Sequence, residues 1–204
     1  MISSKFDYFY PSLIKVEGGY VDHPHDPGGK TIWGVTLYNW MRHLKDCGND
    51  DFYRTVRWSK FREDGDFKTD KFTVDDFKAL KPEDVKYFYL LDYWNVVKAD
   101  EMPLGIDCYL FDFSVNSGPS QATKILQRII RVNDDGRVGP YTVNATHQYT
   151  IAKGAKNLID EYNKERQIFL SKLKNAEHFM RGWNNRLNHV SDTAYEAIRN
   201  TYCR

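Results

Sequence analysis

Cysteine is scarce in this chain, and the three copies stand far apart at Cys47, Cys108 and Cys203. There is no C-x-x-C pair, so the spacing excludes a zinc ribbon, and an odd number of widely separated cysteines does not indicate a disulfide framework. The pattern is typical of a protein that folds in a reducing compartment.

Long apolar runs and net charge are lacking as well. No stretch approaches the roughly 20 apolar residues of a membrane span, so we expect no membrane insertion. The formal net charge is only +1, which argues against a nucleic-acid binder, because phosphate contacts need a surplus of clustered Lys and Arg. Lys5, Asp7, Pro11 and Lys15 interrupt the N-terminal segment. It therefore lacks the unbroken apolar core of a signal peptide, and we expect synthesis in the cytoplasm.

The chain does have enough apolar material for a core, with 41% hydrophobic residues in a length of 204. This length favours one domain with two lobes. Aromatic residues reach 15%, and such rings either fill a core or line a groove that binds sugar faces. Charge is uneven, since residues 46–107 carry 15 acids and 10 bases and residues 153–204 carry 10 bases and 6 acids. The basic C-terminal third either meets an anionic polymer or is an ordinary solvated surface.

The periodicity predicts a mainly α-helical protein. Near the start, apolar residues follow the i, i+3, i+4, i+7, i+8 pattern of an amphipathic helix. They are Phe6, Phe9, Tyr10, Leu13 and Ile14. Pro11 predicts a kink or a late start, and Gly18 with Gly19 ends the helix. Residues 20–36 are dense in Pro, Gly and Asp, which predicts turns with a short irregular hairpin.

Further helices are expected along the rest of the chain. They are one at 37–45, two within 73–93, a buried central helix at 106–116, one capped by Ser117 or Ser120, one from Thr142, a long one over 155–173 and a shorter one near Trp183. Residues 46–72 have no clean period, so we expect a loop-rich insertion there. The segment at 133–140 is expected to form a plain turn, because the calcium-loop pattern that begins at Asn133 fails after Gly136.

The end of the first helix carries a candidate general acid. Hydrolysis of a glycosidic bond needs a proton donor for the leaving oxygen and a second polar group that steers water or stabilises the transition state. The donor must stay protonated near neutral pH, which requires a partly apolar setting. Glu17 lies on the apolar face about three turns after Phe6, and the negative end of the helix dipole disfavours its ionised form. The alternative is an exposed, inert acid at a helix end.

Candidate partners follow in the turn-rich segment. Asp26 and Thr31 come nine and fourteen residues after Glu17, and a chain that doubles back at its prolines and glycines would bring both across a cleft. Asp26 would stay ionised, and Thr31 would hold a water. Asp22 is a rival carboxylate. Asp22 and Asp26 are alternatively turn-formers that bond their own backbone.

The same segment carries a long motif. EGGYV at 17–21, followed by DPGGKTIWGVT at 26–36, resembles the opening of glycoside hydrolase family 108, which reads E-G-G-Y and then D-x-G-G-x-T-x-x-G-[IV]-T. Weaker matches follow in order at Tyr93-Trp94, FDFSVNSG over 111–118, Leu126-Gln127, Asp135-Gly136, VGP over 138–140, Thr142, Gly182-Trp183 and Arg186. The resemblance covers nearly the whole chain. The stretch 46–72 is longer than the family pattern leads us to expect.

The resemblance implies an activity and a fold. Family 108 enzymes are N-acetylmuramidases of phage endolysins and related bacterial proteins. The chain is therefore expected to hydrolyse the β-1,4 bond between N-acetylmuramic acid and N-acetylglucosamine in bacterial peptidoglycan, as a phage endolysin in host lysis. The expected fold is lysozyme-like and mainly α, with a small irregular β-hairpin region after the first helix. We expect no cofactor, peptidoglycan as the partner, a monomer, and access to the wall after holin-type release or by a dedicated export route.

The resemblance also implies the site residues. Glu17 takes the general-acid role. By analogy with the Glu, Asp and Thr set of related phage lysozymes, Asp26 and Thr31 take the second and third roles. In such an inverting arrangement the two carboxyl groups stand about 6.5–9.5 Å apart.

Substrate-binding residues and a domain division are expected on the same grounds. Tyr20, Trp33 and Asn116 are the expected sugar-binding residues, although Trp33 is alternatively core and Asn116 a helix-capping amide. Residues 1–103 form the expected catalytic region, with 46–72 as the insertion. Residues 104–204 form a helical peptidoglycan-binding-like region that packs with the first as one globular unit.

Three alternative functions stay open. A lytic transglycosylase cuts the same bond with one Glu and no water. A metal-dependent wall amidase or peptidase is suggested by His23-x-His25-Asp26, but a third ligand at helical or strand spacing is missing. A non-catalytic wall-binding module would have lost Glu17 or the D-P-G-G-x-T turn, and both are present.

Overall fold

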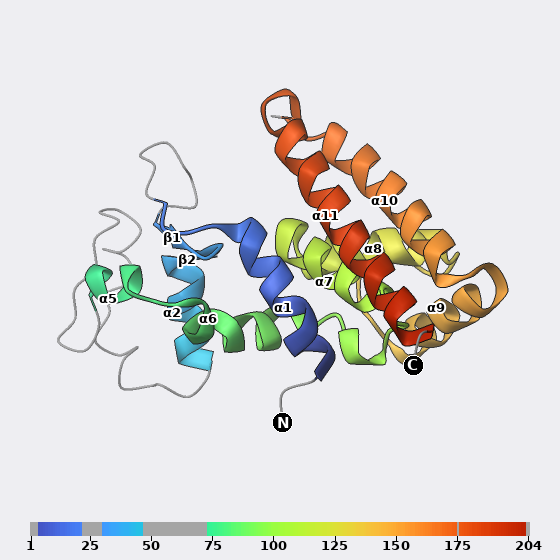
Figure 1. The fold of residues 1–204 in the computed structure, drawn as a ribbon, viewed down its shortest axis with the longest axis horizontal. Coiled ribbons are helices and arrows are strands. Elements are labelled where there is room, and N and C mark those ends of the chain that lie inside the picture. The colour runs from blue at the N-terminus through green and yellow to red at the C-terminus, as the bar shows by residue number, and fades with distance from the viewer. Residues whose placement is uncertain (1–3, 22–29, 47–72, 175, 203–204) are drawn as a thin grey trace. The chain divides into compact units, whose positions relative to one another are not determined.

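The computed structural model describes residues 4–21, 30–46, 73–174 and 176–202. These residues are mainly α-helical, with one small antiparallel hairpin after the first helix, as the sequence predicts (Figure 1). The chain divides into two compact units. We call Leu13–Asp92 the hairpin unit, and Met1–Ser12 with Tyr93–Arg204 the helical unit.

The first helix, α1, spans Ser4–Glu17 and includes Pro11. It begins in the helical unit and ends in the hairpin unit. The helix continues through Pro11 without a break, so the late start that the proline suggested is wrong. Glu17 is its last residue, which places the candidate acid at the negative end of the helix dipole.

The hairpin consists of β1, Thr31–Ile32, and β2, Val35–Thr36. Trp33 and Gly34 connect them, with φ angles of 49° and 76°. Two residues with positive φ form a type I′ turn, whose twist matches that of the flanking strands. The predicted hairpin is confirmed.

The rest of the hairpin unit is helical where it is described. Its helices are α2, Leu37–Asp46, α5, Val74–Lys78, and α6, Pro82–Tyr89. Thr73 caps α5, since its side chain accepts a hydrogen bond from the backbone N–H of Asp76, as expected of a Thr at that position. Val85, Phe88 and Tyr89 are buried on α6, which confirms their predicted inward face. The predicted insertion at 46–72 lies almost entirely outside the described residues, which end at 46 and resume at 73.

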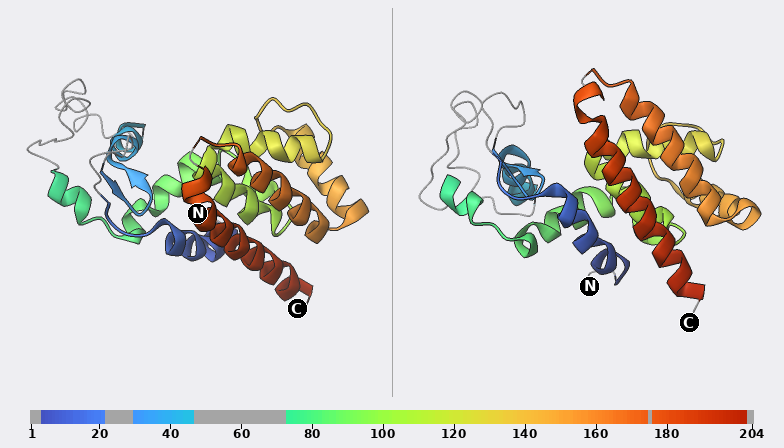
Figure 2. Two further views of the ribbon diagram at one scale, coloured as in Figure 1. Left: turned by 90° about the horizontal axis from the view of Figure 1, so that it is seen from above. Right: turned by 45° about the horizontal axis from the view of Figure 1, so that its top comes forward.

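The helical unit is built around α7, Ile106–Ser117. Every residue from Ile106 to Ser114 is buried, because most of this stretch is apolar and other helices cover it. The helices α8, Pro119–Ile129, α10, Ala155–Ser171, and α11, Ala176–Tyr202, contact it. Figures 1 and 2 show α10 and α11 running antiparallel side by side. The remaining elements of this unit are η1, Leu90–Trp94, which begins in the hairpin unit, η2, Ala99–Glu101, and α9, Pro140–Lys153.

Three predicted helix boundaries are wrong. Neither Ser117 nor Ser120 caps α8, because Gly118 is the N-cap and Pro119 occupies the first turn, where its fixed φ is already helical. The helix predicted from Thr142 begins at Pro140 for the same reason. The short helix predicted near Trp183 is α11, the longest helix described, with 27 residues.

Aromatic rings fill the core of the helical unit where α1 begins. The rings of Phe6, Trp94 and Phe111 meet edge to face, with centroids 5.2 to 5.7 Å apart. Such pairs stabilise a core beyond the apolar area that they bury. These three aromatic residues therefore belong to the core and do not line a groove.

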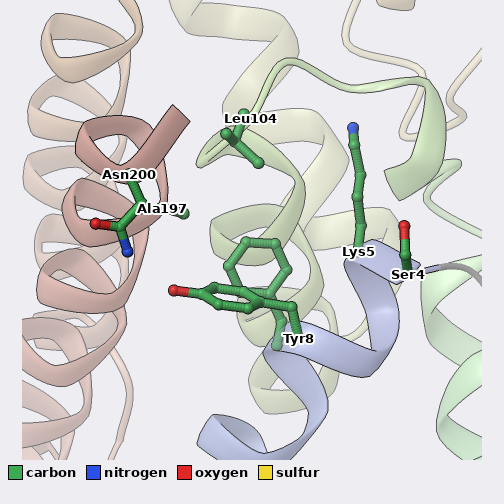
Figure 3. Close-up of a pocket in the computed structure, with 7 residues that line it drawn as sticks. Ser4, Lys5, Tyr8, Leu104, Ala197 and Asn200 are labelled. Atoms are coloured by element: carbon green, nitrogen blue, oxygen red, sulfur yellow. The ribbon is translucent and has the colours of Figure 1, made fainter. Parts of the chain in front are cut away.

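A cavity of about 350 Å³ lies beside the first turn of α1 within the helical unit. Figure 3 shows the residues around it, with Lys5 and Tyr8 from α1 and Leu104, Ala197 and Asn200 from later elements. The Lys5 amine donates to the backbone carbonyl of Met102 at 3.0 Å and lies 3.3 Å from the Asp107 carboxylate. This ion pair ties the start of α1 to the start of α7.

The turn at 133–140 is organised by one buried amide. Gln127 donates to the Asp135 carboxylate at 2.8 Å and accepts from the Gly136 N–H at 2.9 Å. Asp134 is paired with Arg128. These bonds support the plain-turn interpretation over a calcium site.

None of the helices in the described part of the chain combines the length and the apolar character that a membrane span requires.

Candidate active site

Glu17 lies in the hairpin unit with its carboxyl group directed at the hairpin turn. A Cβ built on Gly34 would clash with Oε2 of Glu17 and would lie 2.8 Å from its Cδ. The residue is half-buried, and its Oε1 atom is shielded from solvent. Both the shielding and the helix end disfavour the ionised carboxylate.

The turn that receives this carboxyl group has an uncommon backbone. Trp33 adopts φ 49°, a left-handed conformation that is unfavourable for a bulky residue. Two bonds hold it there. Its indole N–H donates to the carbonyl of Leu80 at 2.7 Å, and its own carbonyl accepts from the Tyr89 hydroxyl at 2.6 Å. Strain that is held in place by its surroundings is frequent at functional sites.

Tyr89 lies near Gly34, as Glu17 does. Its side chain is buried, and its hydroxyl would lie 2.7 Å from a Cβ on Gly34. The hydroxyl of Tyr89 and the carboxyl group of Glu17 therefore meet at the same glycine. The arrangement provides a half-buried acid, a glycine surface and a bonded turn, which together suit proton donation to a bound ligand.

Thr31 is fixed by the backbone at the start of β1, two residues before the turn. Its N–H donates to the carbonyl of Val21 at 2.9 Å, and its carbonyl accepts from the Val21 N–H at 2.8 Å. Thr31 also pairs with Thr36 across the hairpin. Asp26 and the rival Asp22 lie outside the described residues, so their predicted roles stay predictions.

Two of the three predicted sugar-binding residues belong to the hairpin unit. Tyr20 is half-buried, and the Lys78 ammonium stands 5.6 Å from the centroid of its ring. Trp33 is also half-buried, so part of its side chain packs against the protein and part is accessible to solvent. Its bond to Leu80 fixes the indole in one orientation.

Asn116 belongs to the helical unit, at the end of α7. Its side-chain oxygen accepts from Arg166 at 3.3 Å and from the Ser117 hydroxyl at 3.1 Å. Both bonds are accepted by the side-chain oxygen of Asn116. A role of Asn116 in sugar binding stays a prediction.

Arg166 also pairs with Asp112 inside the helical unit. The guanidinium of Arg166 stands 2.7 Å from the Asp112 carboxylate, which Arg186 contacts at 2.9 Å on its other oxygen. Burial raises the pKa of Asp112, and the charges of Arg186 and Arg166 together bring that pKa below its usual value. The residue pair F-D and the later Arg186, which belong to separate motifs of the sequence, meet in one buried cluster.

Sequence reasoning missed Gly34 and Tyr89 as site residues. Gly34 is part of the quoted motif, and a glycine after Trp33 was a usable sign of a two-residue turn. Tyr89 stood in the sequence only as one apolar position of an inward helix face. Its bond to Trp33 spans 56 positions, and no local spacing pairs the two.

The described residues hold no group of three or more His, Cys, Asp and Glu side chains placed to bind a metal ion. His23, His25 and Asp26, which suggested a metal-dependent alternative, lie outside those residues.

Comparison with known proteins assigns the chain to a family. The description "Glycosyl hydrolase 108" matches residues 10–118, which is more than half of the chain. The chain belongs to glycosyl hydrolase family 108. It is therefore a glycoside hydrolase that acts on peptidoglycan, and the predicted family is confirmed.

Two further similarities extend this family assignment. A second description, "Predicted Peptidoglycan domain", matches residues 121–188, which supports peptidoglycan as the partner. The family 108 chain is also similar to the solved structure of Brucella abortus SagA, with 31% identity, a TM-score of 0.72 and coverage of 94% of each chain. This likeness confirms the lysozyme-like fold. Among curated proteins, none matches the chain.

The family match does not follow the two structural units. It begins within α1, covers the hairpin unit and ends at Gly118, just after α7. The second match contains most of α8, all of α9 and α10, and the first part of α11. The division predicted between residues 103 and 104 stays a prediction.

Proposed function

We propose that this family 108 enzyme is an N-acetylmuramidase that hydrolyses the β-1,4 bond between N-acetylmuramic acid and N-acetylglucosamine. The observation that carries the proposal is the placement of Glu17. Its carboxyl group is half-buried at a helix end and lies against Gly34. Such a setting favours the protonated acid that the leaving oxygen of a glycoside needs.

The proposed reaction is a direct displacement by water. Glu17 donates its proton to the glycosidic oxygen while the bond from that oxygen to the anomeric carbon breaks. Asp26 accepts a proton from the water that attacks the opposite face of the sugar, and Thr31 helps to hold this water. Glu17 is left as a carboxylate and Asp26 as an acid, and exchange with solvent restores both. The order of groups is that of an inverting glycosidase.

Sugar binding is proposed for Tyr20, Trp33 and Asn116. The two aromatic rings offer faces for sugar stacking, and the fixed indole of Trp33 would present its face without a further ordering step. Asn116 would donate from its NH₂ group, since its oxygen is already bonded.

Product analysis on purified peptidoglycan tests the proposal. Wild-type enzyme should release fragments with reducing N-acetylmuramic acid ends, identified by mass spectrometry. Glu17→Gln removes the proton donor at nearly constant shape and should lower the rate by about 100-fold or more, with an unchanged melting temperature. Glu83→Gln is the matched control, because Glu83 is exposed on α6 of the same unit, and it should keep full activity.

The other outcomes of this experiment identify the alternatives. Anhydro ends would assign the chain to the lytic transglycosylases. Release of peptides without glycan cleavage, abolished by EDTA, would assign it to the metal-dependent amidases or peptidases. Full activity of Glu17→Gln would remove Glu17 from the reaction, and inactivity of the wild type on all peptidoglycans would favour a binding module.

A biological setting is proposed with the activity. The enzyme would act as a monomeric phage endolysin, made in the host cytoplasm and admitted to the wall by a holin or by a dedicated export route. Expression in bacteria should leave cells intact until the inner membrane is permeabilised, and lysis should then follow within minutes. Lysis without permeabilisation would point to an export route of its own.

A further inference from the structure

A charged site lies within the helical unit, in the part that matches the peptidoglycan domain. It is a cavity of about 530 Å³ that adjoins the end of α8, the end of α9 and the middle of α10. Six charged residues line it: Arg128, Arg131, Lys153, Lys164, Glu161 and Glu165. Because four are cationic and two anionic, the cavity favours an anionic ligand. We call it the basic cavity.

Arg131 stands at an unusual position of the backbone. Its φ is 58°, and it directly follows the last turn of α8. Its N–H donates to the carbonyl of Arg128 at 3.2 Å, and the next N–H, of Val132, donates to Gln127 at 3.0 Å. This is the Schellman arrangement, in which glycine normally occupies the left-handed residue. An arginine there is less stable than a glycine by about 1 kcal/mol, so the helix stop by itself does not call for an arginine.

The electrostatic surroundings place the Arg131 charge near the cavity wall. Burial raises the pKa of Tyr149 to about 12, the adjacent Glu161 raises it as well, and the charge of Arg131 opposes both. Lys153 stands 4.6 Å from the centroid of the same ring. Tyr149 therefore lies near Arg131, Lys153 and Glu161, which are three of the residues that line the cavity.

The four cations differ in how they are neutralised. Arg128 is paired with Asp134 at 2.6 Å, and Lys153 covers the Tyr149 ring. Across the described ranges, no carboxylate lies within 4.0 Å of the side-chain nitrogens of Arg131 or Lys164. The positive charges of Arg131 and Lys164 are therefore not neutralised by an ion pair, and they can attract an anionic ligand. A guanidinium offers a planar fork to a carboxylate, and an ammonium adds a point charge.

Peptidoglycan supplies anions mainly through its peptides. In the intact polymer the lactyl group of N-acetylmuramic acid is bound in an amide, so the glycan strand itself is nearly neutral. The stem peptides carry free carboxylates. We propose that the basic cavity binds a carboxylate of the stem peptide through Arg131 and Lys164, at a distinct site from the one that cleaves the glycan. The proposal rests on the proposed function in one respect, which is that peptidoglycan is the ligand.

Calorimetry with a soluble stem peptide tests this directly. The probe is the tetrapeptide L-Ala-D-Glu-diaminopimelate-D-Ala, which has no glycosidic bond, so its binding is independent of Glu17. The full chain should bind it, and Arg131→Gly and Lys164→Gln should each weaken binding by about fivefold to tenfold, the range of a partly exposed charge pair with hydrogen bonds. Arg131→Gly restores the usual residue of the motif, so its melting temperature should not fall.

Two controls are needed. The first tests whether the position of the removed charge matters, and the second tests whether the ligand is the carboxylate of the peptide or another carboxylate. Lys172→Gln makes the same charge change on an exposed residue, the C-cap of α10, which does not line the cavity, and it should bind the tetrapeptide as the wild type does. Glycan strands stripped of peptides by an amidase carry free lactyl carboxylates, and their binding should not depend on Arg131 or Lys164.

The outcomes decide the proposal in both directions. No binding of the tetrapeptide at millimolar concentration, or equal binding by the wild type and the Arg131→Gly, Lys164→Gln double variant, would overturn it. Binding of stripped glycan that depends on the two cations, together with binding of the tetrapeptide that does not, would identify the lactyl group as the ligand. That result would also overturn the proposal. A fully active Glu17→Gln enzyme that still binds the tetrapeptide through Arg131 would leave this proposal standing while the proposed reaction fails.

Discussion

The carboxyl group of Glu17 occupies the space that a side chain on Gly34 would need. The hairpin turn therefore does more than reverse the chain, because its glycine forms the surface against which the candidate acid lies. Two requirements meet at Gly34, a positive φ of 76° and the absence of a Cβ. The first would be met at moderate cost by other residues, but the second is met by glycine alone.

Gly34→Ala is predicted to lower activity by about 100-fold, since even a displacement of about 1 Å in a reacting group has effects of this size. The positive φ should also lower stability by about 1–2 kcal/mol. Gly154→Ala is the control, because Gly154 has φ 88° but nothing within 4 Å of its added Cβ. It should lose at least as much stability, because φ 88° with ψ 146° is a conformation almost restricted to glycine, and it should keep its activity. Equal activity losses in the two variants would show that Gly34 acts only through the fold.

Removal of the Tyr89 hydroxyl is predicted to loosen the same turn. Tyr89→Phe breaks the 2.6 Å bond to the Trp33 carbonyl and leaves the rest of the ring in place. It should lower the free energy of unfolding by about 1 kcal/mol and reduce kcat more than it raises KM. Tyr87→Phe on the same helix is the control, as Tyr87 is 52% exposed. Unchanged kinetics in Tyr89→Phe would exclude the turn from the reaction.

The second carboxylate is predicted from the motif alone, because Asp22 and Asp26 both lie outside the described residues. Asp26→Asn should slow the clearing of peptidoglycan suspensions by about 100-fold or more, as expected when a general base is lost. Asp22→Asn should have a much smaller effect. The two variants control for each other, since they make the same change four residues apart. If their effects are equal or reversed, the second role moves to Asp22.

Most of the fold was predictable because helical periodicity is a local property. The central helix at 106–116 follows from a largely apolar run, and the inward face of α6 follows from apolar spacing. The long α11 was underestimated. Its buried stripe of Leu187, Val190, Ala194 and Ala197 has helical spacing, but the alanines give a weak apolar signal and polar residues surround them.

The candidate site was predictable only where it is contiguous in sequence. Glu17, Thr31 and Trp33 lie within one motif, so the chain chemistry points to them together. Tyr89 and Leu80, which fix Trp33, come from a segment whose local pattern indicates only a buried helix face and a helix break. Tertiary hydrogen bonds of this kind leave no periodic trace, because one polar atom on an otherwise apolar face does not change the pattern.

The buried cluster around Asp112 is predicted to matter for stability far more than an exposed pair of equal length. Arg166 is 0% exposed, and its guanidinium lies 2.7 Å from Asp112. Arg166→Met should lower the free energy of unfolding by about 3–5 kcal/mol, because it breaks a buried ion pair. Arg128→Met breaks the exposed 2.6 Å pair with Asp134 and should change it by less than about 1 kcal/mol. Urea unfolding measures both, and similar losses would contradict the role of burial.

The ion pair between Lys5 and Asp107 gives a prediction for pH. Asp107 is buried at the start of α7, where one carboxylate oxygen accepts the N–H groups of Gly105 and Cys108, each at 2.8 Å. Burial raises the pKa of Asp107 from 3.8 to about 6, and the nearby Lys5 charge opposes this rise only in part. The folded protein therefore holds a proton at a pH where the unfolded chain has released it.

The stability that comes from this proton is present below pH 3.8 and is lost as the pH rises towards 6. The difference corresponds to about 3 kcal/mol, at 1.36 kcal/mol for each pH unit. Asp107→Asn keeps an acceptor for both N–H groups but cannot titrate. Relative to this variant, the wild type should lose about 2.4 kcal/mol of unfolding free energy between pH 4 and pH 7, measured by urea unfolding at each pH, because part of the full difference is already lost at pH 4. Lys5→Met should extend the loss to higher pH, because without the ammonium the pKa of Asp107 rises further. A difference between wild type and Asp107→Asn that stays constant with pH would mean that Asp107 is ionised throughout this range in the folded protein, with Lys5 offsetting its burial in full.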